Sequence, residues 1–125
     1  MGTGETMKNI VLDDRKAFFI DLDGTLVFHN YDPENIDDEY LPGAIDYLFS
    51  IKDQYLILTT ARSYTHTYKI LDELSETFGI HFSKVLCDLP IGERYLINDY
   101  KGTTIKAFSI NVKRNKGLEC LNQQS

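Results

Sequence analysis

Residues 17–26 have the sequence AFFIDLDGTL, in which a short apolar run stops abruptly at an acid-Leu-acid-Gly series. Short apolar runs of this kind are typical of strands buried on both faces of a parallel sheet. Asp21 and Asp23 follow the run two positions apart, and Gly24 gives the chain the freedom to turn there. Asp and Gly are also common in ordinary turns. A buried strand that ends in this series nevertheless predicts a functional site at its carboxyl end.

Outside this stretch, four apolar runs predict further strands and two periodic stretches predict helices. The first helical stretch begins at Pro42, a favourable first-turn residue, and the second begins at Ser63 and ends at Gly79. This alternation predicts an α/β fold, a Rossmann-like three-layer sandwich with a mostly parallel sheet of about five strands. The four runs are Tyr55–Leu58, Val85–Cys87, Tyr95–Ile97 and Ala107–Val112.

One connection is short for a parallel crossover. Only residues 88–94 separate the third and fourth predicted strands, whereas such a crossover normally takes a dozen residues or more. A fully extended segment of this length reaches roughly 20 Å. We therefore expect a bare crossing without a helix.

The composition predicts one acidic domain. The chain has 125 residues, a net charge of −6 and a pI near 4.9, so we expect a single domain over residues 1–125 with its core at about 16–112. Residues 101–125 carry +4, whereas residues 1–100 carry −10. A dedicated nucleic-acid binder is not expected, because phosphate contacts need clustered cations.

Neither a membrane protein nor an exported protein is predicted. No apolar run approaches the roughly 20 residues that cross a bilayer. The N-terminus lacks the basic segment and long apolar run of a signal peptide. Cys87 and Cys120 have no metal-ligand spacing and suggest no disulfide framework, so we expect a cytoplasmic protein.

Polar side chains follow three of the predicted strands, at the points where the strands end. Asp21 and Asp23 follow the first strand, Thr60 follows the second, and Asp99 follows the fourth. The carboxyl ends of parallel strands share one edge of the sheet, where ligands bind. Carboxylates gathered there repel one another unless a cation lies between them, and oxygen ligands favour Mg²⁺. The pattern therefore predicts a magnesium site at this edge.

Over about residues 16–112, the strand order and these motif residues resemble the haloacid dehalogenase superfamily, most of whose members are Mg²⁺-dependent phosphatases. The resemblance implies that Asp21 is the nucleophile and that Asp23 is the general acid and base. It also implies that Thr60 binds the phosphoryl group and that Asp99 is the metal-binding acid of the last motif.

The chemistry of these side chains suits the implied roles. Asp21 is a carboxylate that can form an aspartyl-phosphate, which splits hydrolysis into two easier displacements. Asp23 would protonate the leaving oxygen and then take a proton from the attacking water. Mg²⁺ held by Asp21, Asp99 and the backbone carbonyl of Asp23 would neutralise phosphate charge. Thr60, Ala61 and nearby backbone N–H groups would hold the phosphoryl oxygens.

The chain departs from the family pattern at one cation. The family expects a Lys that offsets phosphoryl charge, commonly before a Pro after the third strand, and this chain has Leu89-Pro90 there. Lys84 and Arg94 lie at the wrong ends of their predicted strands. Lys101 and Arg62 each come two residues after a predicted site residue, and we favour Lys101 as the substitute. Without such a cation, catalysis should be slow or absent.

The chain also has no room for a cap domain. Residues 27–41 alone separate the first motif from the first helix, and they hold much of an acidic cluster. We expect a short flap, with Phe28, His29, Asn30 and Tyr31 nearest the substrate. The resemblance implies that capless members act on large substrates or complete the site by forming homo-oligomers. The strand ending in Thr-Ala-Arg is also similar to small phosphatases of capsular and other surface polysaccharide synthesis.

Two functions follow from these observations. The leading hypothesis is a Mg²⁺-dependent phosphomonoester hydrolase that works through an aspartyl-phosphate on a small-molecule or macromolecular phosphomonoester. The alternative is a catalytically degenerate domain of the same fold that binds a phosphorylated ligand or partner without turnover, since the expected Lys is absent. Sugar phosphates, nucleotides and phosphoproteins all stay open as substrates.

Overall fold

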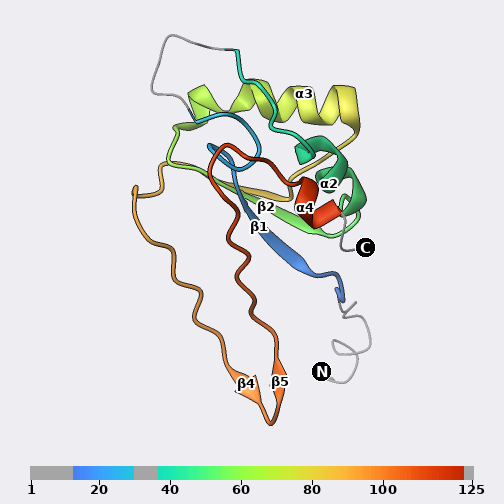
Figure 1. Ribbon diagram of the computed structural model, residues 1–125, viewed down its shortest axis with the longest axis vertical. Helices are drawn as coiled ribbons and strands as arrows, with labels where there is room; N and C mark the ends of the chain where they lie inside the picture. Colours follow the sequence, from blue (N-terminus) through green and yellow to red (C-terminus); the bar gives the residue numbers. More distant parts are fainter. Residues whose placement is uncertain (1–12, 30–36, 123–125) are drawn as a thin grey trace, which may run out of the picture.

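Three parallel strands form the main sheet, and a helix follows each of the first two strands (Figure 1). The computed structural model describes residues 13–29 and 37–122. In chain order the elements are β1 (Ala17–Asp21), α2 (Ala44–Ser50), β2 (Tyr55–Thr59), the 3₁₀-helix η1 (Tyr64–His66), α3 (Tyr68–Phe78), β3 (Lys84–Leu86), β4 (Tyr100–Lys101), β5 (Thr104–Ile105) and α4 (Glu119–Asn122). The chain is therefore a small α/β protein.

The central strand of the sheet is β2, which pairs with β1 on one side and with β3 on the other. β1 and β2 are parallel, with Ala17 opposite Tyr55 and Asp21 opposite Thr59. β3 is also parallel to β2, and its last residue, Leu86, lies opposite Thr59. The carboxyl ends of all three strands therefore meet at one edge, as the sequence predicts for these three strands.

The hydrophobic core lies on one face of the sheet. Its buried residues include Ile20, Leu56 and Leu58 of the sheet, Ala44 and Leu48 of α2, and Ile70 and Leu74 of α3. Successive strand residues point to opposite faces, and on the other face Phe19 is 54% exposed and Leu86 is 42% exposed. Within residues 13–29 and 37–122, both long helices thus cover the same face. The predicted three-layer sandwich is not confirmed, because this arrangement has two layers.

The periodicity of α3 explains both its packing and its end. Ile70 and Leu74, one turn apart, are buried, which is the pattern of a helix with one apolar face. At the C-terminus, the N–H of Gly79 donates to Ser75 at 3.0 Å and the N–H of Ile80 donates to Leu74 at 2.9 Å. These bonds satisfy carbonyls at the end of the helix. The predicted stop at Gly79 is confirmed.

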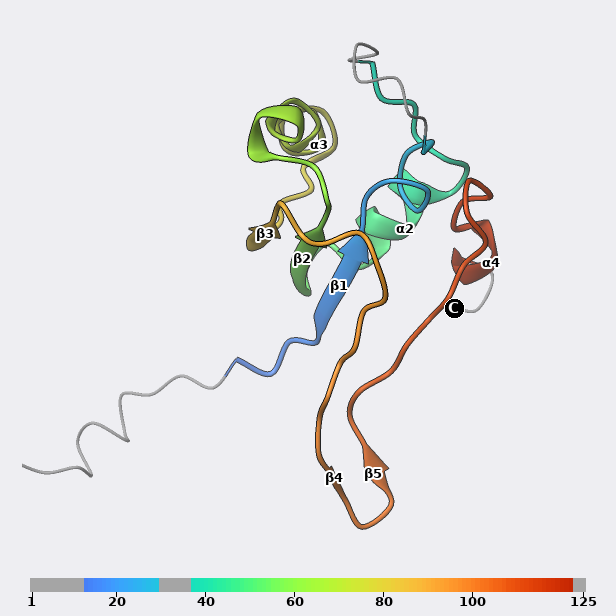
Figure 2. The same ribbon diagram turned by 90° about the vertical axis from the view of Figure 1, so that its left-hand side faces the viewer.

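Residues 91–111 form a long excursion, which we call the arm. Figures 1 and 2 show it leaving the sheet, turning between β4 and β5, and returning toward the body. Only the tip is paired, with Tyr100 opposite Ile105 in antiparallel orientation. The strands predicted at 95–97 and 107–112 are therefore wrong, because these residues belong to no strand. The short 88–94 connection leads into the arm, and no described strand after β3 pairs with β1.

Candidate functional site

The carboxyl ends of β1 and β2 bring the predicted catalytic residues to one edge. Asp21 is the last residue of β1, and Thr60 directly follows β2. The N–H of Leu22 donates to Thr59 at 3.2 Å, which continues the pairing one residue beyond the strand. Leu22 and Leu26 are fully buried. Their burial anchors the loop that carries the two acids, and the loop holds Asp23 above the sheet edge.

This loop closes on itself through backbone hydrogen bonds. The N–H of Gly24 donates to Val27 at 2.7 Å, and the N–H of Leu26 donates to Leu22 at 2.9 Å. Gly24 has φ of 85°, a left-handed conformation that glycine adopts without steric cost. The tight turn places Asp21 and Asp23 at a shallow cavity.

The cavity is small and open, with a volume of about 170 Å³. Its walls come from the acidic loop and from the segment that returns from the arm. The lining residues are Asp21, Asp23, Gly24, Thr25, Val112 and Arg114. One cation and two acids thus line the same cavity, and the cavity is of a size for a phosphoryl group.

The returning segment is fastened to the acidic loop by Asn115. Its backbone N–H donates to the carbonyl of Gly24 at 2.8 Å, and its side-chain Oδ1 accepts from the N–H of His29 at 2.8 Å. Asn115 adopts φ of 62°, and Asn tolerates this left-handed conformation better than most residues. Arg114 is held beside the cavity because the next residue, Asn115, is hydrogen-bonded to both Gly24 and His29.

The environment of Asp21 makes its carboxyl harder to ionise than usual. The residue is exposed as a whole, but burial of the carboxyl group raises its pKa, and the charge of Asp23 raises it further. A hydrogen bond from the Thr25 hydroxyl at 3.1 Å and the charge of Arg94 act in the opposite direction. Desolvation is the largest effect, so the pKa of Asp21 lies above the ordinary aspartate value.

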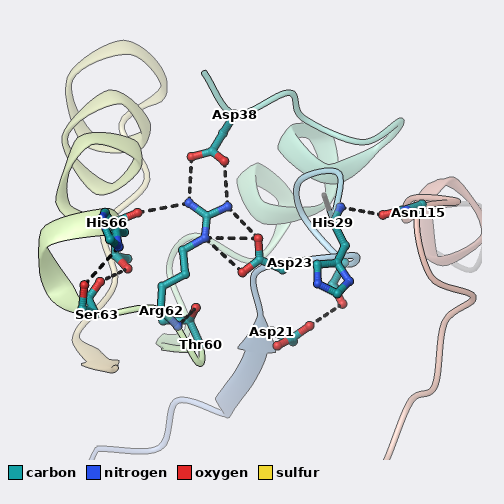
Figure 3. Close-up of polar contacts among 11 residues, drawn as sticks. Asp21, Asp23, His29, Asp38, Thr60, Arg62, Ser63, His66 and Asn115 are labelled. Atoms are coloured by element: carbon teal, nitrogen blue, oxygen red, sulfur yellow. Dashed lines mark hydrogen bonds and ion pairs between the residues drawn. The ribbon is translucent and has the colours of Figure 1, made fainter. Parts of the chain in front are cut away.

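Arg62 lies between two acids, as Figure 3 shows. Its Nε and Nη2 donate to Asp23, with the shortest contact at 2.6 Å, and its Nη1 and Nη2 donate to Asp38 at 3.0 and 2.7 Å. It also donates to the backbone carbonyl of His66 at 3.1 Å. Burial lowers the pKa of Arg62, but the bonds to Asp38 and Asp23 outweigh this effect and raise it. The Arg62 guanidinium is therefore committed to the protein.

Thr60 and Ala61 lie in the turn that leads to Arg62. Thr60 is 1% exposed, and its Oγ1 accepts from the N–H of Arg62 at 3.0 Å. Its carbonyl accepts from the N–H of Leu89 at 3.1 Å. Ala61 is exposed at the same edge. In this arrangement the Thr60 hydroxyl shapes the turn, and its role toward a phosphoryl group stays a prediction.

Asp99 and Lys101 lie apart from these residues. Lys101 is the last residue of β4 and Asp99 precedes that strand, at the far end of the arm, and both side chains are exposed. Figure 2 shows β4 well away from the carboxyl end of β1. The structure thus brings Asp21, Asp23, Thr60, Ala61 and Arg62 together, but it does not bring Asp99 or Lys101 to them.

The acids of one chain do not make the predicted magnesium site. Among the residues that the structure describes, no group of three or more His, Cys, Asp or Glu side chains is placed to hold a metal ion. Of the two carboxylates at the edge, Asp23 is already engaged by Arg62. The donor set is one acid short of the predicted Asp21, Asp23 and Asp99, so it does not fit Mg²⁺ as it stands.

Several residues that shape the site were not predicted for it. Arg114 lies in the basic segment 113–116, whose concentration of cations in an acidic chain was the available signal. Asp38 belongs to the acidic segment expected to form a flap. Arg94, expected at the wrong end of a strand, is near enough for its charge to lower the pKa of Asp21. The sequence alone does not place these three residues at the site, because each is far along the chain from the residues that it acts on.

Backbone hydrogen bonds join the two ends of the expected flap. The N–H of Phe28 donates to Glu39 at 3.0 Å, and the N–H of Leu41 donates to Leu26 at 2.8 Å. Phe28 is 37% exposed. Asn30 and Tyr31, which were also expected near the substrate, lie outside the described residues.

No protein-family model, curated protein or solved structure matches this chain. Of the helices in residues 13–29 and 37–122, none has the length and apolar character needed to cross a bilayer.

Proposed function

We propose that this protein hydrolyses phosphomonoesters through an aspartyl-phosphate on Asp21. The observation that carries the proposal is the cavity at the carboxyl end of β1 that Asp21, Asp23 and Arg114 line together. The two acids supply a nucleophile and a proton-transfer group, and the arginine supplies a charge that attracts a phosphate. A shallow, open cavity suits the terminal phosphate of a small molecule or of a macromolecule.

The reaction would proceed by two displacements at phosphorus. In the first, an Asp21 oxygen attacks phosphorus, the bond to the ester oxygen breaks, and Asp23 gives its proton to that oxygen. In the second, water attacks the phosphorus of the aspartyl-phosphate while Asp23 takes a proton from the water. The Asp21–phosphate bond then breaks, which releases inorganic phosphate and restores both carboxyl groups.

Two arginines support the first displacement better than Lys101 does. Arg114 lines the cavity, and the charge of Arg94 acts on the Asp21 carboxyl. Either guanidinium would offset charge on the phosphoryl oxygens, where the family expects a lysine. Arg62 would instead order Asp23, because its donors are used by two carboxylates. The expectation of Mg²⁺ stays a prediction, and neither displacement is assigned a metal ion, because the described residues at this edge do not make its predicted ligand set.

A second function is favoured by the contact between Arg62 and Asp23. An acid held by an arginine at 2.6 Å is constrained as a proton donor. A domain of this kind could bind a phosphorylated ligand beside Arg114 without turning it over. Beryllium fluoride, which forms an aspartyl-phosphate mimic, separates the two functions, because it attaches only to a competent nucleophile. Attachment at Asp21 supports hydrolysis, whereas phosphate binding without attachment supports the binding function.

The direct test is hydrolysis of an aryl phosphate in the presence of Mg²⁺. Asp21→Asn should lower kcat/KM by at least about 1,000-fold, since it removes the nucleophile. Asp46→Asn is the matched control, because Asp46 is an exposed acid in the first turn of α2, and it should leave the rate unchanged. Equal rates for the wild type and Asp21→Asn would remove Asp21 from the mechanism. A panel of phosphorylated metabolites would then identify the substrate class.

A further inference from the structure

The Arg62 guanidinium uses every one of its N–H groups on the protein (Figure 3). Nε and Nη2 donate to Asp23, Nη1 and Nη2 donate to Asp38, and Nη1 also donates to the carbonyl of His66. A guanidinium is a rigid planar fork with one hydrogen on Nε and two on each Nη. These contacts use all of them, so the side chain cannot turn without breaking several charged hydrogen bonds.

The two carboxylates bind different sides of this fork. Asp38 binds its end, with Oδ2 at 3.0 Å from Nη1 and Oδ1 at 2.7 Å from Nη2. Asp23 binds along its side, where Oδ1 accepts from Nη2 at 2.6 Å and from Nε at 3.1 Å, and Oδ2 accepts from Nε at 3.0 Å. The Nε hydrogen is thus shared between the two oxygens of Asp23, and Oδ2 accepts less from the arginine than Oδ1 does.

Asp38 reaches the arginine from a segment that other hydrogen bonds hold in place. The N–H of Phe28 donates to the carbonyl of Glu39 at 3.0 Å, and the Tyr40 hydroxyl donates to Glu73 of α3 at 2.6 Å. These bonds fasten the residues after Asp38 to the loop after β1 and to α3. The carboxylate of Asp38 is therefore a fixed partner, which orients the end of the arginine.

The cavity is lined by Asp23 but by neither Arg62 nor Asp38, so these two residues reach a bound phosphate only through Asp23. The three side chains are 21–24% exposed, and ion pairs that are partly shielded from solvent are screened less than surface pairs. Burial lowers the pKa of Arg62, but its bonds to Asp38 and Asp23 outweigh this effect and raise it. The arginine therefore stays charged and keeps hold of both acids.

We propose that Asp38 is a positioning residue for proton transfer by Asp23, an inference that rests on the proposed function. By occupying the end of the fork, Asp38 keeps Arg62 along the Oδ1 side of the Asp23 carboxylate. Oδ2 keeps free lone pairs and is the oxygen that gives its proton to the leaving ester oxygen in the first displacement. Without Asp38, the end of the fork is free to bind both oxygens of Asp23 in the bidentate arrangement that arginine forms with carboxylates. Both oxygens would then be held, and proton transfer would slow.

The test compares two phosphate esters that differ in their leaving group. Nitrophenolate leaves without a proton, whereas the alkoxide of an alkyl phosphate, such as ethyl phosphate, must be protonated as it leaves. Asp38→Asn removes the charge and one acceptor oxygen but keeps the size of the side chain. Its kcat/KM, which reports the first displacement, should fall by about tenfold or more for ethyl phosphate and by less than about threefold for nitrophenyl phosphate.

Two further variants show what this comparison means. Glu39→Gln is the matched control, because Glu39 is the next acid in the same segment and is exposed, and it should change neither rate. Asp38→Glu keeps a carboxylate and should recover part of the ethyl phosphate rate. An equal loss for the two esters in Asp38→Asn would show that Asp38 only supports the fold, and no loss for ethyl phosphate would show that it does not position Asp23. Either result overturns the proposal.

A measurement without substrate separates this inference from the proposed function. Since Nη1 and Nη2 are held by different oxygens, rotation of the guanidinium is hindered, and side-chain NMR of the wild type should resolve the two groups. Their signals should merge in Asp38→Asn but not in Glu39→Gln. A wild type that hydrolyses neither ester contradicts the proposed function, and Asp38 would then orient Arg62 without a role in proton transfer. Hydrolysis by the wild type, with the two signals still resolved in Asp38→Asn, contradicts this inference alone.

Discussion

Arg62 donates to the carboxylate of Asp23 through both Nε and Nη2, and the Nη2–Oδ1 distance is 2.6 Å. The same guanidinium bonds Asp38, so it joins the loop after β1, the turn after β2 and the acidic segment before α2. These three parts of the chain have no shared secondary structure. The position of the proposed proton-transfer group thus depends on an arginine from the neighbouring strand end.

We therefore expect Arg62→Ala to destabilise the protein. The side chains of Arg62, Asp23 and Asp38 are 21–24% exposed, and removal of the arginine leaves two close carboxylates unpaired. The free energy of unfolding should fall by about 1–3 kcal/mol, less than for a fully buried pair because solvent still reaches the site. Urea denaturation measures this loss. Arg62→Lys should retain part of the stability, since lysine keeps the positive charge but lacks the planar guanidinium that donates to both carboxylates.

Lys69→Ala is the control for this series, because Lys69 is an exposed cation on α3. It should change the free energy of unfolding by less than about 0.5 kcal/mol. An Arg62→Ala protein as stable as this control would show that the arginine network contributes nothing to folding.

A second prediction concerns the ionisation of Asp21. Burial raises its pKa, and the Thr25 hydroxyl and the charge of Arg94 partly offset this effect. Because the proposed nucleophile must be ionised to attack, kcat/KM should rise with pH through an apparent pKa above about 3.9, the ordinary aspartate value. Thr25→Val removes the donor at 3.1 Å and should move this acid limb to higher pH, as should Arg94→Ala.

The same shift can be followed without an activity, by NMR titration of the Asp21 carboxyl carbon. Since the pKa is raised in the folded state, this group favours folding at pH below about 3.9, and that contribution is lost as the pH rises through the folded-state pKa. Thr65→Val, at an exposed threonine of η1, should leave the titration unchanged. A lower pKa for Asp21 in Thr25→Val would contradict the assigned role of the hydroxyl.

The sequence pattern predicts the three strands of the main sheet correctly. In this part of the fold a helix connects each strand to the strand that it pairs with. β1, β2 and β3 are each apolar, and α2 and α3 bury the same face of all three. Residues 95–97 and 107–112 have similar apolar character. A strand forms only where a neighbouring strand accepts its hydrogen bonds, and among the described residues the 88–94 connection leads residues 95–97 to no such neighbour. Apolar character alone cannot distinguish the two situations.

The same distinction applies inside the site. The proximity of Asp21, Asp23 and Thr60 is predictable, because residues that end adjacent parallel strands share an edge. The pairing of Arg62 with Asp38 is not, since Asp38 comes from an irregular segment 24 positions away. The contribution of Arg114 depends on how the arm returns. The positions of side chains on irregular segments can be predicted only when the three-dimensional path of the chain is known.

A third prediction tests how the returning segment is fastened. Asn115→Gly removes the Oδ1 that accepts from His29 at 2.8 Å but keeps a residue suited to φ of 62°. It should lower the free energy of unfolding by about 1 kcal/mol, the usual net value of one hydrogen bond. Asn115→Ala should cost more, because alanine also strains the left-handed backbone. Asn111→Ala, on the exposed arm, is the control. If Asn115→Ala were as stable as Asn111→Ala, the Asn115 side chain would not hold this segment.

A fourth prediction compares two glycines with similar backbones and different surroundings. Gly79 has φ of 67° and nothing within 4 Å of an added Cβ, whereas Gly117 has φ of 84° and an added Cβ would collide with the backbone carbonyl of Pro42. Gly79→Ala should therefore cost only the left-handed strain, about 1–2 kcal/mol. Gly117→Ala should cost that and more, because it displaces the segment whose Leu118 N–H donates to Pro42 at 2.8 Å. Thermal and urea denaturation of the two variants measure the difference, and equal stabilities would mean that the C-terminal segment does not pack against the start of α2.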